Sequence, residues 1–303
     1  MAQPHYTPAP SADFVLPFDL PDVGLRGRLL RLDSVSTRAL AAHPLPEPGQ
    51  RVLAEALALS ALLGSALKLE GRLSVQTKGD GPLSLLVTDY FAGGGLRGYA
   101  RVDEKNFADT GRPNHFGTMA GKGALAITIE PKKGAQAYQG MVPLSPDGLA
   151  ASAETYFAQS EQLPTRLRLA AGPIYRSGEG RGWRAGAMMV QAVPGAKIDD
   201  INTSDDWQRV SLFMQTLEDV ELLDTSVAAE SILWRLFHED EVRVHPSQRL
   251  HFQCGCEPER VRAVLKSYSV SELKDLPDPD GVIRTRCEFC GTVYEFPLDT
   301  LVE

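Results

Sequence analysis

The chain has 303 residues, of which 43% are hydrophobic and 23% are charged. These values are ordinary for a soluble globular protein of one to three domains. The longest apolar run, Ala56 to Leu67, has 12 residues, whereas a helix that spans a membrane needs about 20. The N-terminus has no basic segment followed by an apolar stretch, so we expect no secretion signal and a cytoplasmic protein.

Charge is unevenly distributed along the chain. The net charge of −8 divides into +4 for residues 1–198, −8 for residues 199–250 and −4 for residues 251–303. Proteins that bind nucleic acid generally carry a basic stripe on one face. The composition therefore argues against a nucleic-acid partner and leaves protein partners open.

The first third of the chain predicts a tail followed by a buried helix. Residues 1–15 are rich in proline and lack periodicity, so we expect a flexible tail. Residues 48–68 show the periodicity of a helix, and the small residues of its apolar stripe permit close approach to a sheet. We expect this stripe to lie in the core; it consists of Leu53, Ala56, Leu57, Ser60, Leu63, Gly64 and Leu67.

Residues 72–190 alternate between strand patterns and turns. Alternating apolar and polar residues indicate half-buried strands, and Gly79 to Pro82 is a turn between the first two. Residues 148–162 predict a helix that stops at Leu163 and Pro164. Antiparallel strands with a few helices indicate an α+β core domain, residues 16–198. The predicted strands are 72–78, 83–87, 96–102, 124–129, 137–142, 166–171 and 184–190.

The sequence pattern changes at Asp199, where strand-like alternation stops. Two amphipathic helical patterns follow, residues 205–216, with Asp205 as the expected N-cap, and residues 226–238. We call residues 199–250 the acidic linker. We expect it to form a helical unit that is separate from the sheet domain.

All four cysteines lie in one window of 37 residues near the C-terminus, as Cys254-Gly-Cys256 and Cys287-Glu-Phe-Cys290. Clustered cysteines in a cytoplasmic protein indicate metal binding or redox chemistry rather than a disulfide scaffold. Four thiolates complete a tetrahedral zinc site. Four unrelated thiols and a purely structural zinc site are the alternatives, but Cys-x-Cys is unusual for a zinc ribbon and favours redox chemistry.

We call residues 251–303 the metal module. They predict a short helix, residues 258–267, and then a strand, the Cys-x-x-Cys turn and a second strand through Tyr294 and Phe296. So short a segment buries little apolar surface, so that a bound metal would replace the missing core.

Weaker patterns carry no catalytic assignment. Gly117 to Gly123 departs from a phosphate-binding loop in spacing and lacks its Ser or Thr, so we interpret it as a glycine-rich turn. His251 could replace a thiolate, but four cysteines already complete the tetrahedron. His238 is interpreted as an exposed helix end, and no serine-hydrolase or zinc-protease motif occurs. We therefore expect neither an enzyme nor a nucleotide cofactor.

Ten stretches of the chain together resemble the 33 kDa heat shock protein family, a family of bacterial redox-regulated holdase chaperones. They occur in the expected order and cover nearly all of the chain after about residue 20. The proline-rich tail and the loop at residues 277–281 depart from the family pattern, and neither touches a cysteine. The matching stretches are 55–59, 70–73, 76–84, 95–101, 138–140, 156–165, 206–210, 235–244, 254–261 and 287–294.

The resemblance implies that the reduced protein binds one Zn2+ through all four cysteines. It also implies that oxidation releases the metal and forms the disulfides Cys254–Cys256 and Cys287–Cys290. Loss of the metal would unfold the module, and repulsion among the 12 carboxylates of the acidic linker would then oppose its compact state. Large apolar side chains of the linker would become available to unfolding client proteins: Trp207, Phe213, Leu217, Trp234 and Phe237.

The family further implies a homodimer in the active state, with no nucleic-acid or membrane partner. Two other functions stay open on the residues alone. A thiol–disulfide oxidoreductase would need an exposed thiol of low pKa at a helix N-terminus and no zinc. A zinc-ribbon module that binds nucleic acid is disfavoured by the −4 charge of residues 251–303.

Overall fold

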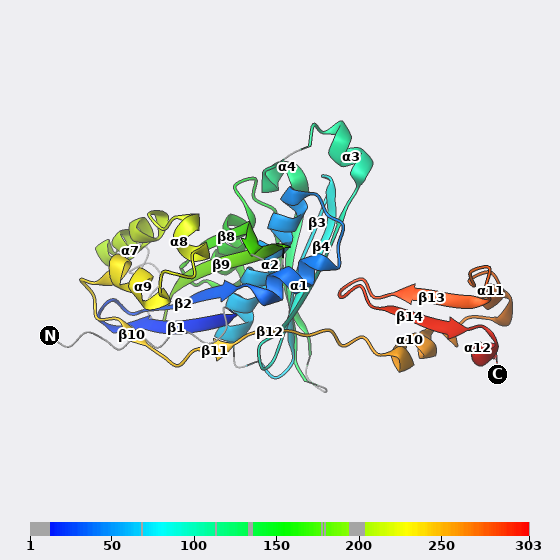
Figure 1. Ribbon diagram of the computed structural model, residues 1–303. Coiled ribbons are helices and arrows are strands. Elements are labelled where there is room, and N and C mark those ends of the chain that lie inside the picture. The colour runs from blue at the N-terminus through cyan, green and yellow to red at the C-terminus, as the bar shows by residue number, and fades with distance from the viewer. Residues whose placement is uncertain are drawn as a thin grey trace.

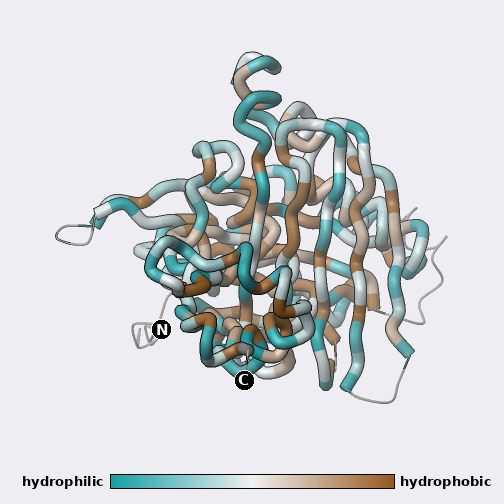
Figure 2. Tube along the Cα trace, turned by 90° about the vertical axis from the view of Figure 1, so that its right-hand side faces the viewer, coloured by the Kyte–Doolittle hydropathy of each residue, from teal (hydrophilic) through white to brown (hydrophobic). Residues whose placement is uncertain are grey.

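Two β-sheets form the body of the molecule in the computed structural model (Figure 1). The structure describes residues 13–67, 69–112, 114–132, 136–176, 178, 180–193 and 204–302. In Figure 2, apolar and polar segments alternate along the long strands, as a period of two residues requires. The predicted α+β class is confirmed. Most of the predicted tail lies outside the described residues, but Phe14 and Val15 already belong to a strand.

The first sheet, which we call sheet A, has the strand order β10-β1-β2-β9-β8, and β11 also pairs with β1. Its pairs are all antiparallel. Residues 166–171 and 184–190 were predicted correctly as parts of longer strands, whereas the sequence indicated no element for β1, β2, β10 or β11. The strands are β1 (Phe14–Leu20), β2 (Leu25–Leu32), β8 (Thr165–Arg176), β9 (Gly180–Ala192), β10 (Arg243–Val244) and β11 (Gln248–Arg249).

The second sheet, sheet B, has the order β12-β5-β4-β3-β6-β7. The five predicted strands of this region are confirmed within a few residues, except that β4 extends farther than expected. The pair β12–β5 is parallel, unlike its antiparallel neighbours. The strands are β3 (Arg72–Gly79), β4 (Leu83–Phe91), β5 (Gly95–Val102), β6 (Gly123–Glu130), β7 (Tyr138–Pro143) and β12 (His251–Phe252).

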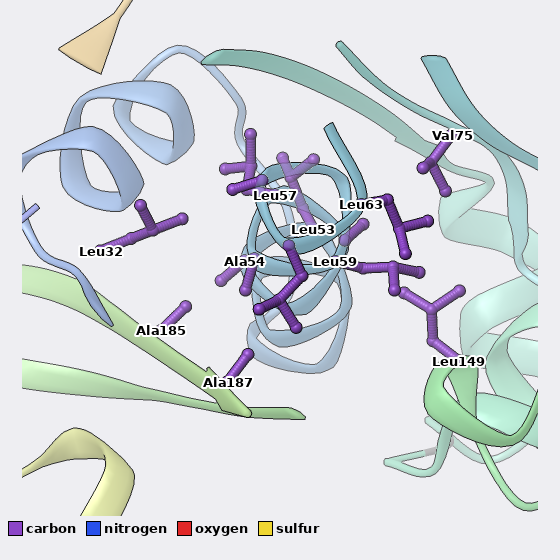
Figure 3. Close-up of a cluster of buried hydrophobic side chains, with 14 of the residues drawn as sticks. Leu32, Leu53, Ala54, Leu57, Leu59, Leu63, Val75, Leu149, Ala185 and Ala187 are labelled. Atoms are coloured by element: carbon purple, nitrogen blue, oxygen red, sulfur yellow. The ribbon is translucent and has the colours of Figure 1, made fainter. Parts of the chain in front are cut away.

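Helix α2 (Glu47–Ala66) packs between the two sheets. Figure 3 shows its side chains between Ala185 and Ala187 of β9 on one side and Val75 of β3 on the other. The predicted stripe is indeed core, but burial extends around most of the helix, because it has a sheet on both sides. Leu67 is the exception, since it follows the last helical residue and is 43% exposed.

Shorter helices connect the strands of the two sheets. The predicted helix 148–162 is an α-helix only to Tyr156 and continues as one π-helical turn, which ends at Gln162 in a left-handed conformation. Gly117 to Gly123 forms α4 and a tight turn into β6, in which the Lys122 amide donates to the Asp80 carboxylate. These helices are α1 (Ser34–Ala41), α3 (Glu104–Asp109), α4 (Phe116–Ala120) and α5 (Leu149–Tyr156).

The helices of the acidic linker follow the sheet domain in the chain and pack on it. They cover the face of sheet A that points away from α2 and form an apolar cluster with it (Figure 1). Ser204, not Asp205, is the N-cap, because its hydroxyl accepts a hydrogen bond from the Trp207 amide. The linker contains α7 (Asp205–Gln215), α8 (Asp219–Leu223), which was not predicted, and α9 (Ala229–Phe237), which is shorter than predicted.

The metal module is a hairpin of β13 and β14 flanked by short helices. Among the described residues its buried core has five members, Leu265, Leu273, Ile283, Phe296 and Leu301. The predicted boundaries of the core domain, the linker and the module remain a prediction, and residues 198 and 199 lie outside the described residues. The elements are α10 (Pro258–Leu265), α11 (Val270–Lys274), β13 (Val282–Arg286), β14 (Val293–Pro297) and α12 (Asp299–Val302).

No helix among the described residues combines the length and the apolar character that crossing a membrane requires.

Replacement of Leu57 by alanine tests the central position of α2. Leu57 is fully buried, so Leu57→Ala is expected to lower the free energy of unfolding by about 2–5 kcal/mol through lost burial and a cavity. The control is Leu67→Ala on the exposed end of the same segment, expected to cost less than about 1 kcal/mol. Urea unfolding followed by circular dichroism measures both, and equal losses would contradict the arrangement.

Glu55 of α2 predicts a pH dependence of stability. Burial raises the pKa of Glu55 to about 7, although nearby Arg51 opposes the shift. The folded protein thus keeps a proton that the unfolded chain releases near pH 4.5, so stability falls as the pH rises between these values. Glu55→Gln is expected to remove this fall of about 3 kcal/mol, whereas Glu47→Gln at the exposed start of α2 should retain it. Urea unfolding from pH 4.5 to 8 measures the slopes.

Candidate metal centre

The four cysteine sulfurs converge on one point, although the two pairs are far apart in sequence. All four lie within 4.8 Å of one another. The Sγ atom of Cys254 lies 3.3 Å from that of Cys256 and 3.6 Å from that of Cys287, and Cys256 lies 3.3 Å from Cys290. A tetrahedron of sulfurs about 2.3 Å from a central zinc ion has edges of roughly 3.8 Å. The cysteines are free thiols, and their spacing fits a metal ion.

A backbone knuckle holds the second cysteine pair. The Cys287 amide donates to the Thr292 carbonyl at 2.9 Å, and the Gly291 amide donates to the Cys287 carbonyl at 2.8 Å. Gly291 has a φ of 71°, a left-handed conformation that glycine adopts without strain. Strands β13 and β14 leave this turn as an antiparallel pair, which fixes the direction of both sulfurs.

An extended segment positions the first pair. We call residues 243–253 the strap, because β10 and β11 pair with β1 of sheet A and β12 pairs with β5 of sheet B. The Gln253 amide donates to the Leu96 carbonyl at 2.8 Å, one residue before Cys254. The strap therefore ends directly at the sulfur cluster.

The second half of the cluster also rests on the core. The Arg286 side chain donates to the Ala42 carbonyl at 2.8 Å, just after α1. The Phe289 ring lies 4.0 Å below the Arg97 guanidinium and 6.3 Å from the Tyr99 ring, both on β5. Arg97 is itself held by the buried carboxylate of Asp89, 2.7 Å away. The first cysteine pair is thus anchored to β5 through Gln253, and the second is anchored to β5 through Phe289 and to the end of α1 through Arg286.

The groups around the sulfurs shift their pKa values in different directions. Burial raises the pKa of the Cys254 and Cys287 thiols. Burial also disfavours the Cys290 thiolate, but hydrogen bonds with the Thr292 hydroxyl and backbone outweigh it and lower the pKa of Cys290 to about 6. The Tyr294 hydroxyl donates to both the sulfur and the carbonyl oxygen of Cys256 at 3.2 Å.

Neither histidine considered in the sequence belongs to this cluster. Among the described residues, the group close enough to share a metal ion consists of the four cysteines. His251 is exposed on β12, and His238 follows α9 with its ring 5.8 Å from Trp234. Sequence reasoning missed Arg97, Tyr99, Phe289 and Arg286, since only the fold brings them together.

Comparison with known proteins agrees with this geometry. The model of the family described as Hsp33 protein matches residues 13–297. The chain belongs to the Hsp33 family. An Hsp33 relative from Caulobacter vibrioides, named 33 kDa chaperonin, is 40% identical over 287 residues, which cover 93% of this chain and 94% of the relative. A 33 kDa chaperonin from Escherichia coli is 36% identical over 272 residues, covering 90% and 88%.

A solved Hsp33 structure shares the fold. The crystal structure of the 33 kDa chaperonin from Thermotoga maritima, a heat shock protein 33 homolog, matches with a TM-score of 0.75 at 23% identity. The match covers 96% of this chain and 98% of that chain. The arrangement of the two sheets, linker helices and C-terminal module is therefore one that a solved protein also adopts.

The five apolar linker residues singled out in the sequence differ in exposure. Trp207, Leu217 and Phe237 are buried against sheet A, and Phe237 stacks on Phe18 of β1 with ring centroids 5.9 Å apart. Phe213 is half-buried at the edge of this cluster. Trp234 departs from the expectation of a covered residue, because it is 66% exposed while the linker is docked.

Replacement of Tyr294 by phenylalanine tests whether the sulfurs form a metal site with an ordered outer shell. Loss of the hydroxyl removes its hydrogen bond to the Cys256 sulfur, so Tyr294→Phe is expected to weaken metal affinity about 10–100-fold. Tyr268→Phe, on a 48% exposed tyrosine of the same module, is the matched control and should bind normally. Competition with a chromophoric chelator measures both affinities, and equal affinities would contradict this role.

Proposed function

We propose that the chain is a redox-regulated, ATP-independent holdase chaperone that binds unfolding proteins after oxidation of its four cysteines. Family membership supports the class of function, since the relatives are named 33 kDa chaperonin. The main structural support is the position of the sulfur cluster at the end of the strap. A chemical change at the sulfurs would act directly on the segment that follows the linker helices. The protein binds clients and catalyses no reaction.

In the reduced state the four thiolates of Cys254, Cys256, Cys287 and Cys290 hold one zinc ion. Zinc bound to four thiolates supplies folding free energy, with apparent values of about 10–16 kcal/mol in small zinc peptides. The five-residue core of the module makes this contribution decisive for its fold. The knuckle and the strap orient the sulfurs, and Tyr294 and Thr292 donate to or accept from them.

Oxidation converts the cysteines into the disulfides Cys254–Cys256 and Cys287–Cys290. With hydrogen peroxide, each pair of thiolates gives up two electrons and forms one S–S bond. The O–O bond breaks, and two protons taken from solvent complete two water molecules. The family resemblance supports this pairing, whereas sulfur distances of 3.3–3.6 Å occur both within and between the pairs. Disulfide sulfurs cannot serve as four thiolate ligands, so the module loses its metal.

The strap transmits this change to the linker. Once the sulfur cluster comes apart, β12 at the start of the module loses the anchor that follows it, and its two-residue pairing with β5 is too short to persist alone. The adjoining β10 and β11 are equally short. The linker helices then lose their C-terminal attachment to the sheets, and repulsion among their carboxylates favours the undocked state.

Release of the linker exposes the client-binding surface. Trp207, Leu217 and Phe237 leave the outer face of sheet A, with Phe213 beside them. Together with Trp234, which is exposed already, they present large apolar side chains on a flexible chain. Such a segment binds unfolded proteins without needing a fixed complementary shape.

The active protein is a cytoplasmic homodimer with no nucleic-acid or membrane partner.

The experiment measures zinc content, hydrogen exchange and aggregation before and after peroxide. We expect one zinc per reduced chain and loss of that zinc on oxidation. Protection should disappear in the metal module and fall in the acidic linker, while strands β1 to β9 remain protected. The oxidised protein should suppress aggregation of a denatured test enzyme without ATP. Dithiothreitol with added zinc is the control and should reverse all of these changes.

Three outcomes would contradict this function. Client holding by oxidised protein whose linker retains full protection would show that the linker is not responsible. Insulin reduction by the cysteines would support an oxidoreductase instead, although neither pair lies in the first turn of a helix. Salt-dependent retention of RNA would support a nucleic-acid-binding module.

A further inference from the structure

Helix α8 of the acidic linker has only five residues, Asp219–Leu223. Isolated helices of this length are unstable in water, and the last carbonyls of any helix lack partners within it. Its N-terminal end is closed by a capping box between Glu218 and Glu221. The carbonyls at the C-terminal end of α8 need hydrogen-bond donors from outside the helix.

Arg31 of β2 supplies most of these donors. Its guanidinium donates to the carbonyls of Glu221 at 2.9 Å, Leu222 at 2.8 Å and Val227 at 2.6 Å. Arg31 is only 3% exposed, and it projects from the face of sheet A that the linker covers. One core side chain therefore closes the end of α8 and the loop that follows it.

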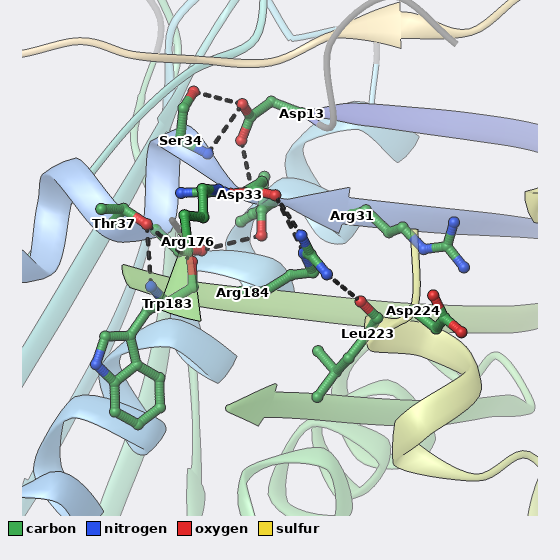
Figure 4. A network of polar contacts seen from close by, with 12 residues as sticks. Asp13, Arg31, Asp33, Ser34, Thr37, Arg176, Trp183, Arg184, Leu223 and Asp224 are labelled. Atoms are coloured by element: carbon green, nitrogen blue, oxygen red, sulfur yellow. Dashed lines mark hydrogen bonds and ion pairs between the residues drawn. The ribbon is translucent and has the colours of Figure 1, made fainter. Parts of the chain in front are cut away.

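Two further arginines of sheet A flank this contact. Arg184 of β9 donates to the Leu223 carbonyl at 2.7 Å and is oriented by the Asp33 carboxylate, as Figure 4 shows. Arg168 of β8 donates to the Leu217 carbonyl at 3.1 Å and to the Asp219 carboxylate at 3.0 Å. The dipole of α8 also stabilises Arg31 and Arg184 at its C-terminal end, whereas Arg168 lies at its start.

Apolar packing brings α8 into reach of these guanidinium groups. Leu217 and Leu222 are fully buried in the cluster beneath the linker. A Cβ atom at Gly186 of β9 would lie 2.7 Å from the Leu222 carbonyl oxygen, so glycine permits the close approach of α8 to the sheet. The contact thus combines two leucine side chains with a row of hydrogen bonds to the main chain.

We propose that Arg31, with Arg184 and Arg168 beside it, is a main-chain latch that keeps the acidic linker docked in the reduced protein. This inference rests on the proposed function and assigns the residues that regulate it. Because the latch recognises carbonyls that converge only while α8 is helical, melting of α8 breaks several hydrogen bonds at once. A buried guanidinium left without these partners opposes release, so the linker leaves as a unit after the strap loosens.

The test is Arg31→Met in the full-length, reduced, zinc-loaded protein. Methionine keeps an apolar stem and removes every donor. Hydrogen exchange in residues 217–227 is expected to rise roughly 10–100-fold, since hydrogen bonds from a charged group are lost. Exchange in β3 and β4 and the zinc content should remain unchanged. Arg31→Lys, which retains one charged donor group, should give a smaller rise.

The matched control is Arg181→Met on β9, because Arg181 pairs with Glu47 of α2, 2.7 Å away, and not with the linker. It should leave exchange in residues 217–227 unchanged. Unchanged exchange in Arg31→Met would overturn the latch. An equal rise across both sheets in both Arg31 variants would also overturn it, because Arg31 would then stabilise the core rather than the docked linker.

Aggregation assays separate the latch from the proposed function. Reduced Arg31→Met should suppress aggregation of a denatured test enzyme partially and without peroxide, whereas reduced wild-type protein should not. If residues 217–227 open as expected but the variant holds no client even after oxidation, the latch is supported and the holdase mechanism fails. If wild-type protein holds clients after oxidation and Arg31→Met shows no opening, the function stands and the latch fails.

Discussion

Sheet A has two apolar faces, and the rest of the structure depends on how each face is covered. Residues of β2 and β9 alternate between two separate clusters, so that Leu30 and Ala187 pack toward α2 while Leu29 and Met188 pack toward the linker. Helix α2 covers one face of sheet A and is covered in turn by sheet B, so it lies in the core of the protein. The linker helices cover the other face and lie at the outside of the molecule, as Figure 1 shows. In the function that we propose, they are the cover that is released.

Docking of the acidic linker combines apolar burial with an electrostatic match. The linker carries −8, and residues 1–198 carry +4. Arg31, Arg168 and Arg184 direct guanidinium groups to its main-chain carbonyls, whose recognition does not depend on side-chain identity. Burial supplies affinity, while these hydrogen bonds require that α8 be folded.

The metal module has the opposite balance, because its apolar core is too small to determine its fold. Four sulfurs converge in the module, and thiolate sulfur is the kind of group that an oxidant attacks. The strap and the Phe289 ring place this centre against β5 of sheet B, and the strap also pairs with β1 of sheet A. Stability and sensitivity to oxidation therefore reside in the same four atoms.

Local pattern was sufficient for much of the protein. The alternation of residues 72–78 and 124–129 predicted β3 and β6, the periodicity of residues 48–68 predicted α2, and the spacing of the cysteines predicted a four-sulfur centre. These features depend on neighbours within a few residues along the chain, which a sequence displays directly. The family resemblance rests on the same local motifs, and the match over residues 13–297 confirms it.

Only the tertiary structure decided which surfaces meet. Strand β1 contains Pro17 and β10 has two residues, so neither has a pattern that stands out without its partner strand. Ser204 rather than Asp205 caps α7, because it is the Ser204 hydroxyl that accepts a hydrogen bond from the Trp207 amide in the folded chain. Arg31 and Val227 are 196 positions apart, and their contact exists only in the folded chain. The sequence by itself determined the local elements and the chemistry of the thiols, whereas packing over long separations determined what the linker covers and what holds it there.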